Sequence, residues 1–206
     1  MSLLPYCVLL ANVARDIPSA GVLEASIETF HQGELAVPFS QIEKNRIMAA
    51  NIQENALAFH RVVHTLFSNA ALVPFRFPTW LSAAELEDHL RKDSWRYQAF
   101  LTRYANHVQM ELRVTAPLAA ASAATGTEHL RTRADHLHRI ERRALELKDR
   151  LADDVLAWRE RDIPEGKRIF ALVERDHLTS FRERLSEQSL SYSGPWPATE
   201  FFAARS

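Results

Sequence analysis

The feature that most limits the possible folds is a long stretch without helix breakers, from Thr125 to Arg161. It contains no proline and no glycine after Gly126, and its apolar residues recur at steps of three and four. Such spacing places them on one stripe of a helix. The stripe consists of Leu130, Ala134, Leu137, Ile140, Ala144, Leu147, Leu151, Val155 and Trp158. With a capping-box pattern at Thr125 and Glu128 and a stop at Pro164-Glu165-Gly166, the stretch predicts one helix of roughly 50 Å.

Three roles suit such a helix: a nucleic-acid-binding arm, a coiled coil, or a crossover helix lying on a sheet. Between Thr127 and Arg161 nine Lys or Arg residues stand beside eight Asp or Glu residues, which is too balanced for a phosphate-binding arm. A heptad of apolar residues runs through the stretch, but its companion positions include Glu141 and Lys148. Two charges on that seam weaken an extended coiled coil. The crossover helix is the reading that we prefer.

Strand patterns on both sides of this helix support that choice. From His107 to Thr115 apolar and polar residues alternate strictly, which predicts a strand with one solvent-exposed face. After the helix, Arg168 to Val173 predicts a strand, Asp176 to about Leu185 a short helix, and Ser189 to Ser193 a last strand. We therefore expect a ferredoxin-like α+β domain over residues 106–194, with a fourth strand from elsewhere in the chain and a tail at 195–206.

Residues 1–105 predict a separate α+β domain. The expected elements are a buried strand at Tyr6–Leu10, a hairpin between Ser26 and Phe39, a helix at Gln41–Ser68, a strand at Leu72–Phe77, and a capped helix from Ser82 to about Tyr104. We expect a break in the first helix near Asn51, and a capping box between Ser82 and Glu85. Pro38 should place the second hairpin strand at a sheet edge or end it.

Composition excludes several classes of protein. The net charge of −1 argues against bulk nucleic acid or an anionic membrane as partner. No apolar run approaches the roughly 18 residues of a membrane-spanning helix. The single cysteine, Cys7, cannot form an intrachain disulfide, and we expect it to pack as a small apolar residue in a cytoplasmic protein.

Catalytic signatures are missing from the sequence. It has no glycine-rich phosphate motif, no nucleophile elbow and no Cys-x-x-Cys pair. His60 and His64 have the spacing of a helical zinc pair, but Arg61 stands where a metalloprotease needs glutamate. We therefore expect no enzyme, cofactor or metal. A small-molecule-binding or catalytic domain, with a pocket around His60, His64 and Arg76, stays the alternative.

Several segments, in order, resemble the gas-vesicle GvpF/GvpL family. They include YCVLLAN at the start, GVLEASIETFHQGELAVPFSQI, AFHRVVHTLF followed by ALVPFRFPT, HVQMELRV, TGTEHLRTR, RIFALVERDHLTSFRERL and the closing SYSGPWPATEFF, of which GPWP is the most specific. The chain departs from the family pattern at Pro78, usually glycine, and at Ala198-Thr199-Glu200. The resemblance implies a two-domain α+β protein with a ferredoxin-like C-terminal domain. It also implies a non-enzymatic role at the gas vesicle, as an assembly or minor shell-associated protein that contacts the major shell protein and other accessory proteins.

A partner that forms an apolar shell requires accessible aromatic patches on an accessory protein. Two clusters are candidates for such an interface. The first consists of Phe75, Arg76, Phe77 and Trp80, and the second of Trp196, Phe201 and Phe202. The competing interpretation is that these aromatic side chains are core, or that they clamp the tail onto a sheet. Arg76, placed among apolar residues, is expected to pair with a carboxylate.

Overall fold

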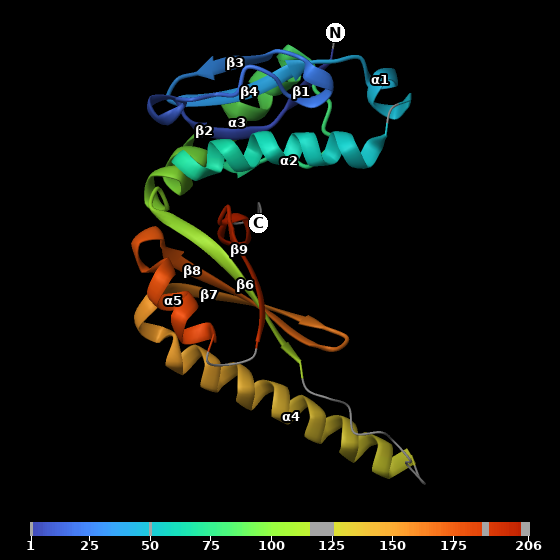
Figure 1. Ribbon diagram of the computed structural model, residues 1–206, viewed down its shortest axis with the longest axis vertical. Coiled ribbons are helices and arrows are strands. Elements are labelled where there is room, and N and C mark those ends of the chain that lie inside the picture. The colour runs from blue at the N-terminus through green and yellow to red at the C-terminus, as the bar shows by residue number, and fades with distance from the viewer. Residues whose placement is uncertain (1, 50, 116–125, 187–189, 203–206) are drawn as a thin grey trace. The chain divides into compact units, whose positions relative to one another are not determined.

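The computed structural model describes residues 2–49, 51–115, 126–186 and 190–202 (Figure 1). The chain divides into two compact units. Unit 1 contains Met1–Asn106 and Pro197–Phe202, and unit 2 contains His107–Trp196. Each unit combines one antiparallel sheet with helices, so the predicted α+β class is confirmed.

The sheet of unit 1 has the strand order β1-β4-β2-β5, and β3 pairs with β4. These strands are β1 (Leu3–Pro5), β2 (Cys7–Leu10), β3 (Ile27–Gln32), β4 (Leu35–Gln41) and β5 (Val73–Pro74). The predicted hairpin is confirmed as β3 and β4, and Gly33 in its turn has a φ of 58°. Every residue of β4 from Leu35 to Ser40 is buried, so both faces of this strand are covered.

The prediction for Pro38 was wrong, because this residue lies inside the central strand β4. Proline has no N–H to donate to a neighbouring strand. Here the Pro38 carbonyl accepts a hydrogen bond from the Tyr6 N–H at 2.9 Å. The Tyr6 carbonyl in turn accepts from the Phe75 N–H, also at 2.9 Å. The Tyr6 carbonyl is therefore satisfied by Phe75 and does not need the N–H that Pro38 lacks.

The helices of unit 1 are α1 (Lys44–Ala49), α2 (Ile52–Asn69) and α3 (Ala83–Arg103), with 3₁₀ turns η1 (Ala11–Val13), η2 (Val22–Glu24) and η5 (Thr199–Phe201). Asn51 caps α2, which confirms the break near that residue, and Ser82 with Glu85 forms the predicted capping box of α3. The predicted strand at 72–77 is reduced to the two residues of β5. Pro74 and Pro78 cannot donate to a ladder, which limits its extension.

Unit 2 has the sheet order β7-β8-β6-β9, antiparallel throughout. Along the chain its elements are β6 (His107–Thr115), α4 (Gly126–Arg150), η3 (Ala152–Asp154), β7 (Val155–Ile163), β8 (Gly166–Glu174), η4 (Arg175–His177), α5 (Leu178–Ser186) and β9 (Ser191–Trp196). Buried Ile140, Ala144 and Leu147 show which face of α4 packs against the sheet. The crossover interpretation of the helix is thereby confirmed.

The predicted length of that helix was wrong. α4 ends at Arg150, and the last part of the stretch forms the strand β7. Pairing with β8 determines this outcome, and Pro164-Glu165 makes the turn between the two strands instead of stopping a helix. The fourth strand of the sheet is therefore β7, which comes from the predicted helix stretch and not from elsewhere in the chain as we expected. The capping residue Thr125 lies outside the described residues.

The exposure predicted for one face of β6 was also wrong in part. Val108, Met110, Leu112 and Val114 are buried as expected. On the other face, however, Gln109 and Glu111 are only 5% and 8% exposed. Arg113 and Thr115 are exposed there. The polar face of this strand is therefore buried over half of its length.

No helix among the described residues is both long and apolar enough to cross a membrane.

Candidate protein interface

The aromatic segment 75–80 of unit 1 is partly packed against the rest of that unit. The Phe77 ring lies 5.2 Å from Phe59, whose ring stacks on Tyr6 at 5.1 Å. The Phe75 ring lies 5.8 Å from the imidazole of His89. Both phenylalanines are half-buried, so each contributes to packing and still presents part of its ring to solvent.

Arg76 and Trp80 are the other two candidates of this segment. Arg76 is exposed, and within the described part of the chain it forms no ion pair with a carboxylate, so the expected pairing is not observed. The Arg76 carbonyl accepts a hydrogen bond from the Thr79 hydroxyl at 2.5 Å. Trp80 is half-buried. The guanidinium of Arg76 is consequently accessible to a partner.

The tail residues Phe201 and Phe202 pack inside unit 1 on α3. Phe201 is buried, and the Phe202 ring stacks on Tyr97 at 5.1 Å with its plane tilted by 23°. The Phe100 ring meets it edge-on with the ring centres 5.1 Å apart, and the Arg96 guanidinium lies 4.0 Å above the Phe202 ring. The cation and the aromatic contacts together stabilise this arrangement. The core interpretation describes the buried Phe201, and Phe202 holds the tail on the helix α3, not on the sheet as we expected.

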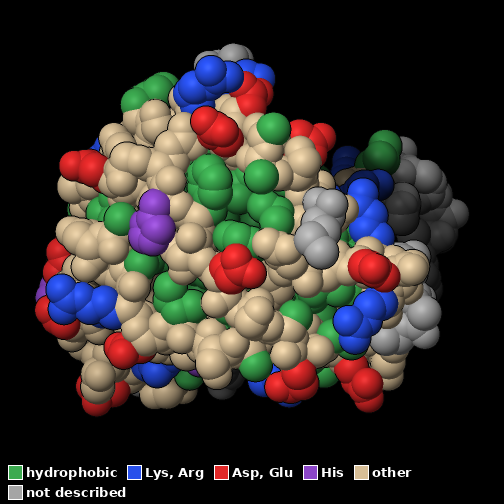
Figure 2. All heavy atoms as spheres, turned by 90° about the horizontal axis from the view of Figure 1, so that it is seen from above, with side chains coloured by type: hydrophobic (Ala, Val, Ile, Leu, Met, Phe, Trp, Pro, Cys, Tyr) green, Lys and Arg blue, Asp and Glu red, His purple; other side chains and the backbone are tan. Residues whose placement is uncertain are grey.

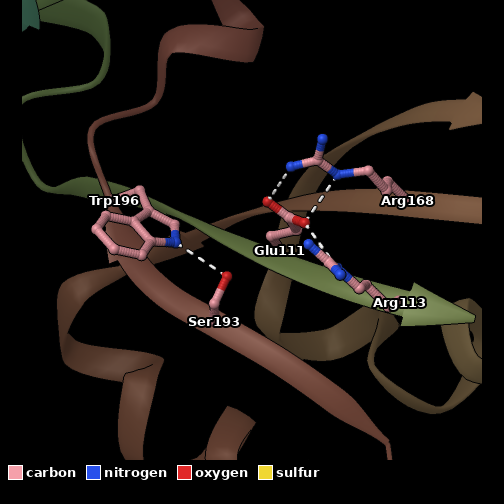
Figure 3. Close-up of polar contacts among 5 residues, drawn as sticks. All are labelled: Glu111, Arg113, Arg168, Ser193 and Trp196. Atoms are coloured by element: carbon pink, nitrogen blue, oxygen red, sulfur yellow. Dashed lines mark hydrogen bonds and ion pairs between the residues drawn. The ribbon is translucent and has the colours of Figure 1, made fainter.

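Trp196 belongs to unit 2, at the end of β9. Its indole N–H donates a hydrogen bond to the Ser193 hydroxyl at 3.1 Å, as Figure 3 shows. The side chain is half-buried. The structure therefore does not join Trp196 to Phe201 and Phe202 in one cluster of a single unit.

A buried polar network holds the loop before β3 against the sheet of unit 1. The Val22 N–H donates to the Tyr6 hydroxyl at 3.0 Å, this hydroxyl pairs with Ser40 Oγ at 3.0 Å, and Ser40 donates to the Ser26 carbonyl. Burial raises the pKa of Tyr6. A Cβ on Gly21 would lie 1.9 Å from the Tyr6 oxygen, so only glycine fits there. This geometry explains why the segment GVLEASIETFHQGELAVPFSQI begins with a glycine, Gly21.

Sequence reasoning missed the most exposed aromatic side chain among the described residues, Trp95. It is 71% exposed on α3. Leu86, Leu90 and Leu101 define the buried stripe of that helix, and Trp95 lies on the opposite side at 100° per residue. A helical wheel drawn on the predicted helix would have identified it. Tryptophan is enriched at binding surfaces, so Trp95 joins the candidates.

The surface charge is mixed. On the face drawn in Figure 2, apolar side chains reach the surface in several small patches, and acidic and basic groups alternate around them. Neither sign gathers over this face, consistent with the net charge of −1. Such a surface suits a protein partner with apolar contacts better than one recognised by charge alone.

Several reactive side chains can be assigned ordinary positions. Cys7 is fully buried as predicted, and burial raises the pKa of its thiol, which disfavours the nucleophilic thiolate. His60 and His64 are exposed on α2, so they do not enclose a pocket. Among the described residues no group of three His, Cys, Asp or Glu side chains has the arrangement of a metal site.

The face of the unit 2 sheet opposite Met110 and Leu112 contains a partly buried ion pair (Figure 3). Arg168 Nε donates to Glu111 Oε1 at 2.8 Å, and its Nη2 donates to Oε2 at 2.6 Å. Arg113 approaches the same carboxylate at 3.4 Å. The hydrogen bonds from Arg168 lower the pKa of Glu111, and partial burial opposes them. Glu111 therefore carries its charge at neutral pH.

Comparisons with known proteins place these features in a family. The model of the family described as "Gas vesicle synthesis protein GvpL/GvpF" matches residues 3–170. The crystal structure of GvpF from Anabaena sp. PCC7120 is similar with a TM-score of 0.79 and 13% identity, covering 100% of this chain and 97% of the other. GvpF from Microcystis aeruginosa gives 0.80 and 12%, covering 98% and 99%. No curated protein sequence matches the chain.

Proposed function

Because the chain belongs to the gas vesicle GvpL/GvpF family, we propose that it is a non-enzymatic protein of gas-vesicle assembly, or a minor component associated with the shell. In this proposal it contacts the small major shell protein, and through it or beside it other accessory proteins. It would act at the gas vesicle in the cytoplasm. The observation that carries the proposal is the structural match to two GvpF proteins across both units, not one domain alone.

The domain organisation belongs to the same proposal. We infer that unit 2 is a ferredoxin-like domain, since its β-α-β-β-α-β chain order and its sheet order β7-β8-β6-β9 have that topology. We keep the division into residues 1–105, residues 106–194 and a tail at 195–206 as a proposal, in which the tail lends Pro197–Phe202 to unit 1.

We place the shell contact on unit 1. Trp95 supplies a large aromatic surface that the fold leaves in solvent, and Arg76 supplies an accessible cation beside the half-buried Phe77 and Trp80. Interfaces gain most of their affinity from a few such Trp and Arg side chains. Phe201 and Phe202 contribute indirectly in this proposal, because they hold the tail on α3.

Co-purification tests the contact. The chain and a tagged major shell protein would be co-expressed, and capture would be compared between the wild type and Trp95→Ala. Leu57→Ala is the matched control. Leu57 is 61% exposed on α2, so this substitution also removes an exposed apolar group. We expect about tenfold weaker capture for Trp95→Ala and little change for the control. A wild-type chain that captures no shell protein contradicts the proposal.

Two further variants locate the surface more closely. Arg76→Ala and Trp80→Ala test the aromatic segment on the same assay, and loss there with Trp95→Ala unaffected would move the contact to that segment. The alternative of a small-molecule-binding or catalytic domain has no observation in its favour. The histidines on which it depended are exposed on α2.

A further inference from the structure

The strand β3 forms an outer edge of the unit 1 sheet (Figure 1). It pairs with β4 in one continuous register from Ile27 to Gln32, and no described strand pairs with its other side. An unpaired strand edge presents backbone donors and acceptors that can pair with a further strand. Such an edge is open to a partner unless the sequence or the fold blocks it.

The other sheet edges are blocked in ways that proteins commonly use. In unit 1, β1 and β5 have three and two residues, and each contains a proline. In unit 2, β7 has four consecutive charged residues, Arg159–Asp162, and the pairing of β9, which contains Pro195, is interrupted between Gln109 and Glu111. Short strands, charges, prolines and bulges all prevent pairing between edges. Among the described strands, β3 is therefore the regular edge that stays open.

The backbone groups of Thr29 point away from β4. Thr29 is opposite Pro38, whose nitrogen carries no hydrogen. The Pro38 carbonyl accepts from the Tyr6 N–H, on the side of β4 that faces away from β3. Thr29 and Pro38 therefore exchange no hydrogen bonds, and the N–H and C=O of Thr29 lie on the open edge.

His31 presents its backbone to the same edge. Along an antiparallel strand, positions that bond to one neighbour alternate with positions that point to the other side. Ile27 and His31 must then point outward like Thr29, and the Ile27 N–H does so, because it donates to the Ser19 carbonyl at 3.3 Å. Within the described part of the chain, Thr29 and His31 have no backbone partner on this side. The open edge thus has two residues with unused donors and acceptors.

A second copy of β3 fits this edge in an antiparallel register centred on Phe30. In that register Thr29 of one copy lies opposite His31 of the other, so the outward backbone groups of both residues are paired. Phe30 lies opposite its own copy, at a position where opposed Cα atoms are about 4.5 Å apart. The ring is half-buried in the single chain, and a cross-strand aromatic pair would cover more of it.

The charged side chains favour the same register. Glu28 of one copy would lie opposite Gln32 of the other, whose amide can donate to the carboxylate, and no like charges would be opposed. A register centred on Thr29 would need the Ile27 N–H, which is already bonded. A register centred on His31 would place two imidazoles opposite each other. Two-fold symmetry requires one residue at the centre, and Phe30 is the residue that suits it.

We propose that two copies of this chain pair through β3, so that their unit 1 sheets join into one continuous antiparallel sheet. The occupant is a second copy because one register pairs the outward backbone groups, the aromatic rings and the charged side chains of both strands. Self-pairing does not use Trp95 or Arg76. It can therefore fail while the shell contact proposed for those residues stands, and the reverse also holds.

Sedimentation velocity of the full chain over a range of concentrations tests the pairing. Thr29→Pro removes an outward N–H that β4 does not use. Thr29→Val is the matched control, because it also removes the hydroxyl but keeps the N–H. We expect a concentration-dependent dimer for the wild type, at least about tenfold weaker dimerisation for Thr29→Pro, and less than about a twofold change for Thr29→Val.

Disulfide cross-linking tests the register and does not depend on the proline variant. In the proposed dimer, Phe30→Cys places two cysteines on opposed Cα atoms about 4.5 Å apart, within the range of a disulfide. Glu28→Cys is the control, because its two copies would be roughly 14 Å apart along the strands. Glu28 is exposed and Cys7 is fully buried, so reactivity alone would favour the control. Under mild oxidation we expect a linked dimer from Phe30→Cys and little from Glu28→Cys.

Several outcomes overturn the proposal. A wild-type chain that stays monomeric at every concentration has no such pairing. Equal dimerisation of Thr29→Pro and Thr29→Val, or equal cross-linking at positions 28 and 30, would assign the dimer to another surface or register. A monomeric chain whose Thr29→Pro variant loses capture of the tagged shell protein would assign the β3 edge to a strand of that protein instead.

Discussion

The two sheets of this chain are stabilised in different ways. In unit 1, β4 is buried along its length, and its polar contacts centre on one hydroxyl network around Tyr6. In unit 2, one face of β6 is apolar, and on the other face Glu111 forms an ion pair with Arg168. The comparison shows that the first sheet is stabilised by packing and by the close approach of the Gly21 backbone to the Tyr6 hydroxyl. The second depends in addition on ionised side chains.

Ion pairs also join α4 to the sheet of unit 2. Lys167 in β8 contacts Glu141 of α4 at 2.7 Å and Glu160 of β7 at 3.0 Å, and Lys148 of α4 pairs with Glu160. The hydrogen bond that Lys167 donates to Glu141 raises the pKa of Lys167, and the one that Lys148 donates to Glu160 lowers the pKa of Glu160. Glu141 and Lys148 are the residues that weakened the coiled-coil seam. They attach the helix to its own sheet.

The largest loss of stability is expected from a substitution at Gly166 in unit 2. This substitution tests whether a close approach of the glycine backbone to its neighbour stabilises unit 2 as it does unit 1. Gly166→Ala would place a Cβ 2.0 Å from the Val114 carbonyl oxygen, a backbone atom that cannot rotate away. We expect a loss of about 4 kcal/mol or more in unfolding free energy, measured by urea denaturation. Gly33→Ala is the control, with nothing within 4 Å and a φ of 58°, and should cost about 1–2 kcal/mol. Equal losses would contradict this account.

Breaking the ion pair between Glu111 and Arg168 should have the next largest effect. Arg168→Gln leaves the buried Glu111 carboxylate with only the longer contact to Arg113. We expect a loss of about 2 kcal/mol, below the range for fully buried pairs because Arg168 is about a third exposed. Urea denaturation at neutral pH measures it. Glu111→Gln/Arg168→Met removes both charges, and a double variant no more stable than Arg168→Gln would argue against the cost of an unpaired carboxylate.

In unit 1 the corresponding polar contact should matter less. Tyr6→Phe removes the hydroxyl that accepts from the Val22 N–H and pairs with Ser40. We expect a loss of about 1–2 kcal/mol, since neutral hydrogen bonds contribute less than charged ones and Ser40 keeps the Ser26 carbonyl. Tyr192→Phe, at an exposed tyrosine of unit 2, is the control. A loss larger than that of Arg168→Gln would reverse the ranking of the two sheets.

The smallest and most selective change is expected from acid. The pKa values of Glu111 and Glu160 are lowered in the folded chain, so their contribution to stability is present above the unfolded value of about 4.3. It is lost as pH falls from that value through the lower folded pKa. In unit 1 the carboxyl groups with lowered pKa are the exposed Glu85 and Asp88, whose contribution salt screens. In high salt, amide NMR signals of unit 2 should disappear first, and simultaneous loss would refute this difference.

The predictions that held depended on local signals. β6 was predicted to its terminal residues because the alternation of apolar and polar residues can be recognised within the strand itself. The start of α3 was predicted because Ser82 and Glu85 form a capping box within four residues. β7 was missed because Leu151, Val155 and Trp158 continue a helical spacing, while the strand is decided by pairing with β8. Pro38 was misplaced for the same reason. Whether a strand tolerates a proline depends on whether the adjacent strand needs a hydrogen bond from that position, and the local sequence does not show this.

The candidate surfaces show the same limit. The aromatic segment could be found in the sequence, but its half-buried state depends on Phe59, and Phe202 became a clamp only when α3 was in place. Register contacts were equally invisible: Arg113, Arg168 and Arg161 are paired on three adjacent strands, although Arg113 and Arg161 are far apart in the chain.

The discontinuity of unit 1 has a consequence for the order of synthesis. Pro197–Phe202 belong to unit 1, yet they are translated after all of His107–Trp196. Domains generally fold in order from the N-terminus as the chain emerges. Tyr97 and Phe100 on α3 therefore stay uncovered by Phe202 until unit 2 has been made. During that interval a nascent chain presents an aromatic surface that the finished protein does not, and a chaperone or an early partner has a defined period in which to bind it.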